Sequence, residues 1–395
     1  MLDILLAALS VIVNFKGVRL LPQGVECAAP ALGWLCSAVL LRARSTRFFV
    51  AALTVQSIGA ALCARNQFTK KSLLALRMFY LPLCSSFLSL GLGHLMPRVS
   101  PYALSTALIS QSWAALGGLV VLMCYPATIF NITETQEIRE ARFASATRLL
   151  ESCDMSVHRH LISSTITGRH IDSVTVRQRQ RTDRWVVYVG GNAEIFEDTV
   201  DDVGTMGDQI KSNFILLNPR GIGRSTGFVS QVSDLVEDTA AVVKHYVETE
   251  SIDQRKLLFI GHSIGGGIAA EVVAKCFPDA SLVLDRTFSS LSDAAVCFSP
   301  LTPWLTKIVI PVLIGDLKTM EHWEKINHKR KVIIFSKRDE ILKFDACSPA
   351  RLSLDENTDL IELHGQNVAS WHNCPFKSFR EKDEIYAKIN EFTSS

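Results

Sequence analysis

The chain has 395 residues, of which 48% are hydrophobic and only 20% are charged, and its mean hydropathy is +0.21. This composition excludes a single ordinary soluble domain and indicates a membrane part. The net charge of +2 is the sum of two regions of opposite charge. Residues 1–130 hold 10 basic and 2 acidic side chains, and residues 131–395 hold 31 basic and 37 acidic side chains. No domain-wide basic excess lies outside the hydrophobic region, so the sequence disfavours a nucleic-acid-binding protein.

Residues 1–131 are predicted to form a hydrophobic membrane region. The run from Val99 to Phe130 contains no charged side chain over 32 residues, and about 20 apolar residues are enough to cross the hydrocarbon core of a bilayer. Three shorter apolar runs precede it, at 28–41, 48–64 and 78–96. We therefore expect a multi-pass membrane protein with several transmembrane helices.

The cysteine pattern argues against a metal site or a disulfide framework. The chain has 10 cysteines, and those after residue 131 are scattered with no C-x-x-C pair. Isolated thiols of this kind fit a reducing compartment better than an oxidising one. We expect no metal and no cofactor, and we expect the region after residue 131 to face the cytosol.

The rest of the chain is predicted to contain a helical connector at 132–160 and an α/β domain at 161–395. Residues 134–153 have the apolar spacing of an amphipathic helix. Beyond them, short β-branched or aromatic runs alternate with segments of helical length, which indicates a mostly parallel sheet with helices on both faces. The predicted strands start at Ser173, Trp185, Asn213, Lys256, Ser281, Lys331 and Asp359.

The strand that begins at Lys256 ends in a motif typical of a nucleophile elbow. It continues directly into Gly261-His262-Ser263-Ile264-Gly265 and then into a helical segment. A serine in a strained turn between strand and helix needs small neighbours, because a Cβ at the flanking positions would clash. The alternative is a glycine-rich turn that allows tight packing of helix on sheet without catalysis.

Two further loops follow predicted strands. Gly190, Gly191 and Asn192 end the strand that starts at Trp185, so the N–H groups of Asn192 and Ile264 are expected to form an oxyanion hole. A phosphate-binding loop is the alternative, but neither a Walker lysine nor a G-x-G-x-x-G spacing is present. The glycine-bearing loop 218–227 contains two arginines, which we expect to hold the loop in place.

The acid and the base of a triad are expected later in the chain, in that order. Asp339 follows the late strand at Lys331 and is the preferred acid, with Glu340 and Asp285 as alternatives. His372, in the loop before the last helical segment, is the preferred base. His364 ends a predicted strand and is the alternative base, or else a satisfied structural histidine.

The segment 286–327 is longer than a crossover between two strands requires. Its apolar run "SPLTPWLTKIVIPVLIG" fits either a cap that forms an acyl pocket or a packed crossover helix. The sequence leaves both open.

Four motifs, "GHSIGGG", "YVGGNAE", "NPRGIGRSTG" and "LDRTFSS", together resemble the α/β-hydrolase superfamily. More closely, they resemble the chlamydial CHLPS-protein family, membrane-associated proteins of unassigned activity. The resemblance covers about 163–392 and implies an α/β-hydrolase fold in a bacterial, host-associated membrane setting. Gly190 stands where many hydrolases have a histidine, which is a departure in the oxyanion loop.

The sequence thus predicts a membrane-anchored serine hydrolase of the esterase, thioesterase or lipase type. Ser263 would attack the acyl carbonyl, His372 would transfer the proton, and Asp339 would orient the imidazole. The expected partners are a lipid bilayer and an acyl ester or lipid substrate, and protein partners are left open. The alternative is a catalytically inactive α/β-hydrolase scaffold that serves as a membrane interaction module.

Overall fold

The computed structural model describes residues 136–163, 169–192, 194–227, 229, 231–299, 302–326, 330–352, 358–366 and 368–394. The chain divides into two compact units, Met1–Cys124 and Tyr125–Ser395, and every described residue belongs to the second. The membrane region predicted at 1–131 therefore lies outside the described residues. Within the described residues, no helix combines the length and the apolar character needed to cross a membrane.

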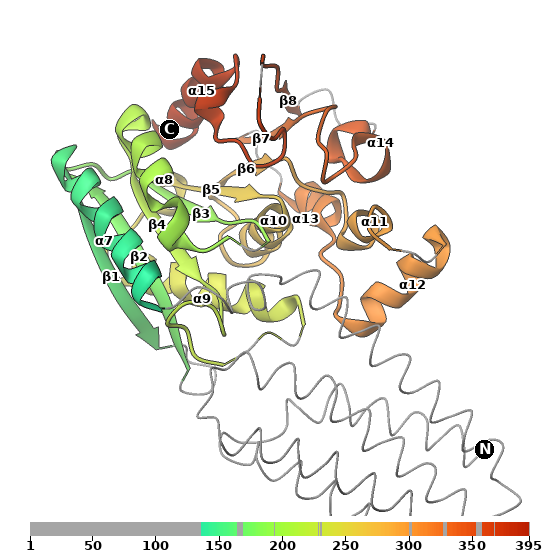
Figure 1. The fold of residues 1–395 in the computed structure, drawn as a ribbon, viewed down its shortest axis with the longest axis horizontal. Helices are drawn as coiled ribbons and strands as arrows, with labels where there is room; N and C mark the ends of the chain where they lie inside the picture. Colours follow the sequence, from blue (N-terminus) through green and yellow to red (C-terminus); the bar gives the residue numbers. More distant parts are fainter. Residues whose placement is uncertain are drawn as a thin grey trace, which may run out of the picture. The chain divides into compact units, whose positions relative to one another are not determined.

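The described residues form one eight-stranded sheet with the strand order β1-β2-β4-β3-β5-β6-β7-β8 (Figure 1). β2 pairs antiparallel with both β1 and β4, and every other pairing is parallel. The strands are β1 (Met155–Ser163), β2 (His170–Gln178), β3 (Trp185–Val189), β4 (Asn213–Asn218), β5 (Leu257–His262), β6 (Ser281–Asp285), β7 (Lys331–Phe335) and β8 (Asp359–Glu362).

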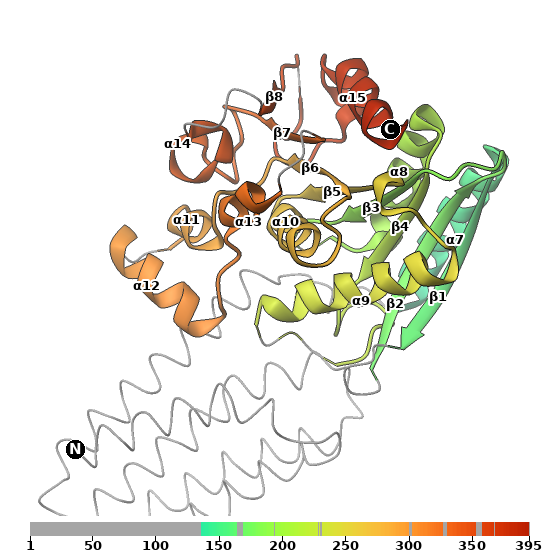
Figure 2. The ribbon, with the colours of Figure 1, turned by 180° about the vertical axis from the view of Figure 1, so that it is seen from behind.

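Helices cover both faces of the sheet, as the continuous apolar strands predict. Figures 1 and 2 show α7 (Gln136–Ser152), α8 (Phe196–Ile210) and α15 (Lys382–Ser394) on one face. The opposite face carries α9 (Ser233–Thr249), α10 (Ile264–Cys276) and α13 (Thr319–Lys325). Three helices lie outside these layers: α11 (Leu291–Val296), α12 (Pro303–Leu313) and α14 (Phe344–Cys347). Short 3-10 turns occupy Gln254–Lys256, Pro349–Arg351 and Phe376–Ser378.

One strand was not predicted. β1 begins inside the segment expected to be a helical connector, and Met155 to Ser163 pair in register with Gln178 to His170 of β2. The reason is its composition, because "VHRH" interrupts any apolar run and most of the strand is partly buried or exposed at the edge of the sheet. An edge strand needs no continuous apolar sequence, so its pattern is weak.

The strand order places the loops of interest at one edge of the sheet. β3 lies between β4 and β5. The chain passes from β3 through α8 to β4 on one side of β3, and then through α9 to β5 on the other side. In open α/β sheets, ligands bind beyond the carboxyl ends of the strands at this kind of switch point. The loops that follow β3, β5, β6, β7 and β8 all leave from that edge.

Candidate active site

Ser263 lies in a strained turn between β5 and α10. Its backbone angles are φ 53° and ψ −121°, a region that non-glycine residues adopt only where the surrounding structure enforces it. A Cβ on Gly261 would collide with the carbonyl oxygen of Gly265, and a Cβ on Gly265 would collide with the carbonyl oxygen of Val189. Both positions therefore require glycine, and the turn is the elbow that the sequence predicts.

Two hydrogen bonds hold the elbow against the neighbouring strand. The Ser263 N–H donates to the carbonyl oxygen of Asp285 at 3.0 Å. The Thr287 hydroxyl donates to the carbonyl oxygen of Ser263 at 2.6 Å. Because the last residue of β6 and the loop that follows it bind both polar groups of the Ser263 backbone, the strained conformation persists.

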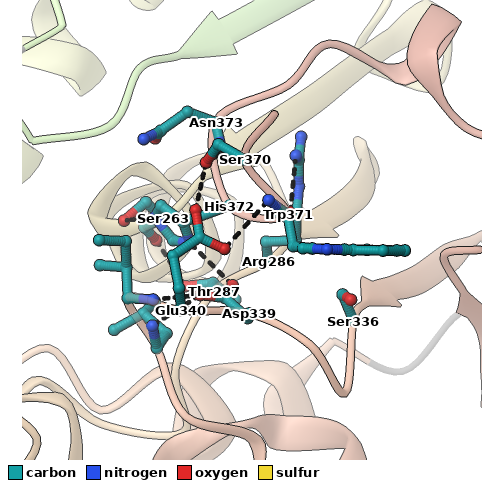
Figure 3. Close-up of polar contacts among 12 residues, drawn as sticks. Ser263, Arg286, Thr287, Ser336, Asp339, Glu340, Ser370, Trp371, His372 and Asn373 are labelled. Carbon is teal, nitrogen blue, oxygen red and sulfur yellow. Dashed lines mark hydrogen bonds and ion pairs between the residues drawn. The ribbon is translucent and has the colours of Figure 1, made fainter. Parts of the chain in front are cut away.

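The structure brings the three predicted triad residues into one chain of hydrogen bonds (Figure 3). His372 Nε2 lies 3.0 Å from Ser263 Oγ, and His372 Nδ1 lies 2.7 Å from Asp339 Oδ2. All three side chains are buried. Asp339 Oδ1 accepts the N–H groups of Ile341 at 2.9 Å and Leu342 at 2.7 Å, so the turn after β7 orients the carboxylate.

Burial lowers the pKa of His372 below its ordinary value of 6.5, although the nearby carboxylate of Asp339 opposes the shift. The positive charge of Arg286 contributes to the decrease. A neutral imidazole at pH 7 donates Nδ1–H to Asp339 and leaves the Nε2 lone pair for the Ser263 hydroxyl, an assignment that follows from the bonding pattern. His372 is thus in the protonation state that a general base requires.

The loop that carries His372 is held from two sides. Glu340 accepts hydrogen bonds from the Ser370 hydroxyl and from the Trp371 N–H, the latter at 3.0 Å (Figure 3). Arg286 Nη1 donates to the carbonyl oxygens of Trp371 at 3.3 Å and Cys374 at 2.7 Å. Glu340, one alternative acid, therefore supports the base loop.

Asp285, the other alternative acid, has different partners. It accepts a hydrogen bond from His262 Nδ1 at 2.9 Å, and Arg286 donates to its oxygens at 2.7 and 2.8 Å. Burial alone would raise the pKa of Asp285, but Arg286 and His262 more than offset this and hold it well below the usual range. The His262 and His372 ring centroids lie 5.0 Å apart, so the second buried pair supports the elbow beside the triad.

His364, the alternative base, lies beyond β8 at the surface. Its side chain is 58% exposed, and Nδ1 lies 3.0 Å from Glu381 Oε1. It is a satisfied histidine, as the second interpretation of the sequence proposed. The structure brings His372, and not His364, to Ser263.

The expected oxyanion loop is shaped by Glu194, which the sequence analysis missed. Its carboxylate accepts the Gly191 N–H and the Tyr188 hydroxyl, the latter at 3.0 Å. Burial and the neighbouring carboxylate raise the pKa of Tyr188 well above its ordinary value, so the phenol remains a donor. Asn192 and Ser263 both line the same cavity. Ile264 is the first residue of α10, where backbone N–H groups lack acceptors within the helix.

A cavity of about 530 Å³ opens at Ser263. Among the described residues its lining comes from α8, from the ends of β3 and β5, and from the loops after β3, β5, β6, β7 and β8. Of the segment 286–327, only Arg286 is among the described residues that line it. Of the two interpretations of that segment, the cap and the packed crossover helix, the cap has no described residue beyond Arg286 in this cavity. The lining combines polar and charged side chains with apolar ones such as Val203, Ile341 and Pro375; the polar and charged ones include Asn192, Asp198, Thr199, Asp202, Arg286 and Asn373.

Part of the chain is similar in sequence to known proteins. Residues 184–344 match the family described as serine aminopeptidase, S33. A segment of 121 residues, 30% of this chain, is 31% identical to the α/β-hydrolase domain-containing protein WAV2 of Arabidopsis thaliana and covers 39% of it. A segment of 150 residues is 25% identical to protein bem46 of Schizosaccharomyces pombe and covers 49% of it. The described residues have an α/β-hydrolase fold, and residues 184–344 carry the family match.

The chain spans less than half the length of either curated relative. Among solved structures, the hydrolase domain is similar to a Pyrococcus furiosus esterase, with TM-score 0.45 and 16% identity over 62% of this chain and 92% of the other. It is also similar to an α/β-hydrolase from Vibrio vulnificus, with TM-score 0.48 and 17% identity over 67% and 94%. None of these matches tests the resemblance to the CHLPS-protein family, which stays a prediction.

The two arginines of loop 218–227 pair with carboxylates on α7 and α9. Arg220 is buried and donates to Asp238 Oδ1 at 2.7 Å. Arg224 donates to Glu140 Oε2 of α7 at 2.6 Å. Both guanidinium groups therefore bind carboxylates of the chain itself. In the residues that the structure describes, no cluster of three or more histidine, cysteine or acidic side chains could hold a metal ion.

Proposed function

We propose that the chain is a membrane-anchored serine hydrolase that acts on acyl esters. The observation that carries the proposal is the hydrogen-bonded series from Ser263 through His372 to Asp339. The Ser263 hydroxyl attacks the acyl carbonyl while His372 Nε2 accepts its proton, and the imidazolium returns that proton to the leaving alcohol. Asp339 stabilises the imidazolium through Nδ1–H. Water then hydrolyses the acyl-enzyme by the same proton transfers.

The oxyanion of the tetrahedral intermediate is held by the N–H groups of Ile264 and Asn192. Three facts support this assignment. Ile264 directly follows the nucleophile at the start of α10, Asn192 shares the cavity with Ser263, and backbone donors of this kind stabilise negative charge at helix N-termini. Glu194 fixes the turn on which Asn192 lies by accepting the Gly191 N–H.

Membrane anchoring forms the second part of the proposal. The charge-free run from Val99 to Phe130 supports it, and a domain tethered to a bilayer would meet acyl lipids or lipid-soluble esters as substrates. The resemblance of the four motifs to the CHLPS-protein family adds a bacterial, host-associated setting. The isolated thiols after residue 131 favour a hydrolase domain that faces the cytosol.

Ester turnover tests the proposal. The purified full chain is assayed with p-nitrophenyl esters, acyl thioesters and lipid esters, alongside the variant Ser263→Ala and the matched control Ser152→Ala, whose exposed side chain lies at the end of α7. We expect Ser263→Ala to lose turnover and Ser152→Ala to retain it. Turnover by Ser263→Ala equal to that of the wild type would rule out the serine mechanism. A wild-type chain that is inactive on every ester would favour the scaffold alternative.

A further inference from the structure

Two cysteines outside the active site lie side by side, although they are 50 positions apart in the sequence. The sulfur atoms of Cys297 and Cys347 are 3.8 Å from each other. Cys297 follows α11, and Cys347 is the last residue of α14. Cys347 is fully buried, whereas Cys297 is partly exposed. The pair therefore combines one thiol that solvent reaches with one that it does not.

We propose that Cys297 and Cys347 form an oxidisable thiol pair, a modification site that a peroxide converts into a disulfide. A disulfide holds its sulfur atoms about 2 Å apart, so the two sulfurs need to approach by less than about 2 Å. The proposal does not depend on the hydrolase activity, because neither cysteine belongs to the triad or lines the cavity at Ser263.

The surroundings distinguish the roles of the two thiols. The hydrogen bond with Cys347 and the nearby charge of Lys343 lower the pKa of Cys297. The same contact and burial raise the pKa of Cys347. Because the thiolate is the nucleophile, the partly exposed Cys297 reacts first with the oxidant. Cys347 then acts as the resolving thiol, which is the arrangement of many redox-sensing cysteines.

The reaction proceeds in two balanced steps. The Cys297 thiolate attacks one oxygen of hydrogen peroxide, so that an S–O bond forms, the O–O bond breaks and hydroxide leaves. Cys297 is thereby oxidised to a sulfenic acid and the peroxide is reduced. The Cys347 sulfur then attacks the Cys297 sulfur, an S–S bond forms, and the hydroxyl leaves as water with the Cys347 thiol proton. In total, two thiols and one peroxide give one disulfide and two waters.

The new bond would join segments that already contact each other. Ser289, which follows β6, donates its N–H at 2.7 Å and its hydroxyl at 3.0 Å to the carbonyl oxygen of Cys347. α14 in turn begins directly after the turn that orients Asp339. A disulfide at this point therefore links the α11 segment to the helix that follows the acid loop, and we expect it to raise the melting temperature.

Peptide mapping tests the proposal on the full chain. The reduced protein is treated with hydrogen peroxide, alkylated and digested with trypsin, which releases Cys297 in peptide 287–307 and Cys347 in peptide 344–351. We expect these two peptides to be linked after oxidation and separate again after reduction. Cys297→Ser should abolish the link and leave Cys347 alkylatable. The matched control Cys276→Ser, which removes an exposed cysteine at the end of α10, should retain it.

Two results would overturn the proposal in the wild-type chain, so it does not depend on a variant that fails to fold. One is oxidation of Cys297 to a sulfinic acid while Cys347 remains a free thiol. The other is linkage of either residue only to a different cysteine. Thermal melting adds a separate readout: oxidation should raise the melting temperature of the wild type and leave that of Cys297→Ser unchanged, and an equal or lower value for the oxidised wild type would contradict the proposed link.

Discussion

Asp339→Asn is the substitution for which the structure gives the most detailed expectation. The carboxylate makes three hydrogen bonds: Oδ2 accepts from His372, and Oδ1 accepts two backbone N–H groups at 2.9 and 2.7 Å. An asparagine keeps its oxygen on the two backbone donors, which turns its NH₂ group towards His372 Nδ1. Because that nitrogen then has to accept, the ring proton moves to Nε2. The imidazole can no longer take the proton of Ser263.

The magnitude follows from the loss of the correct tautomer. In serine hydrolases the corresponding change lowers kcat by about 10⁴-fold while the geometry persists, which is about 5 kcal/mol of activation free energy. Two of the three hydrogen bonds remain, so we expect Asp339→Asn to fold and its melting temperature to fall only moderately. Steady-state kinetics on a p-nitrophenyl ester and thermal melting measure the two effects separately.

A matched control separates this effect from the general loss of a carboxylate. Asp316 accepts the Ser292 N–H at 3.0 Å and the Ser292 hydroxyl at 2.7 Å, outside the cavity at Ser263. Asp316→Asn should keep kcat within about twofold of the wild type. If folded Asp339→Asn kept kcat within about tenfold of the wild type while Asp285→Asn was inactive, the acid would be Asp285 and the reasoning above would be refuted.

Three other predictions concern the base, its protonation and the anchor. His372→Ala should lower kcat by about 10⁴-fold or more. His364→Ala removes an exposed side chain paired with Glu381, so it should cost less than about 1 kcal/mol of stability and leave kcat unchanged. Kinetics and thermal melting of both variants check this, and the opposite pattern would contradict it. Burial lowers the pKa of His372 below 6.5, and only the neutral imidazole accepts a proton. The acid limb of kcat/KM measured against pH should therefore have its midpoint below 6.5, and a midpoint above 6.5 would count against the base. In fractionation, the full chain should sediment with membranes, and a fragment of residues 131–395 should stay in the supernatant. A full chain in the supernatant and a fragment in the pellet would contradict an anchor at 99–130.

The sheet and the elbow could be predicted because their sequence signals are local. A parallel strand covered on both faces reads as a continuous apolar run, and β5 is buried at all of its positions. The elbow is encoded within five consecutive residues, Gly261 to Gly265. β1 gave no comparable signal, because an edge strand with "VHRH" at its centre shares its composition with surface helices and loops.

The residues that support the base could not be assigned from local patterns. Arg286 holds the carbonyl oxygens of Trp371 and Cys374, which lie 85 and 88 positions away. Glu340 was considered only as an acid, because nothing in its neighbours indicates that its carboxylate reaches the loop of His372. Glu194 lies three residues from the Gly191 N–H that it accepts, and this short spacing could have revealed it.

Labelling by a fluorophosphonate tests most directly whether Ser263 is an activated nucleophile. The full chain is treated with the probe and digested with trypsin, which releases Ser263 in peptide 257–275, and the adduct is located by mass spectrometry. Our account predicts one adduct, on Ser263, which forms in the wild type and is strongly reduced in His372→Ala. A folded wild-type chain with no adduct, or with the adduct on another residue, would contradict it.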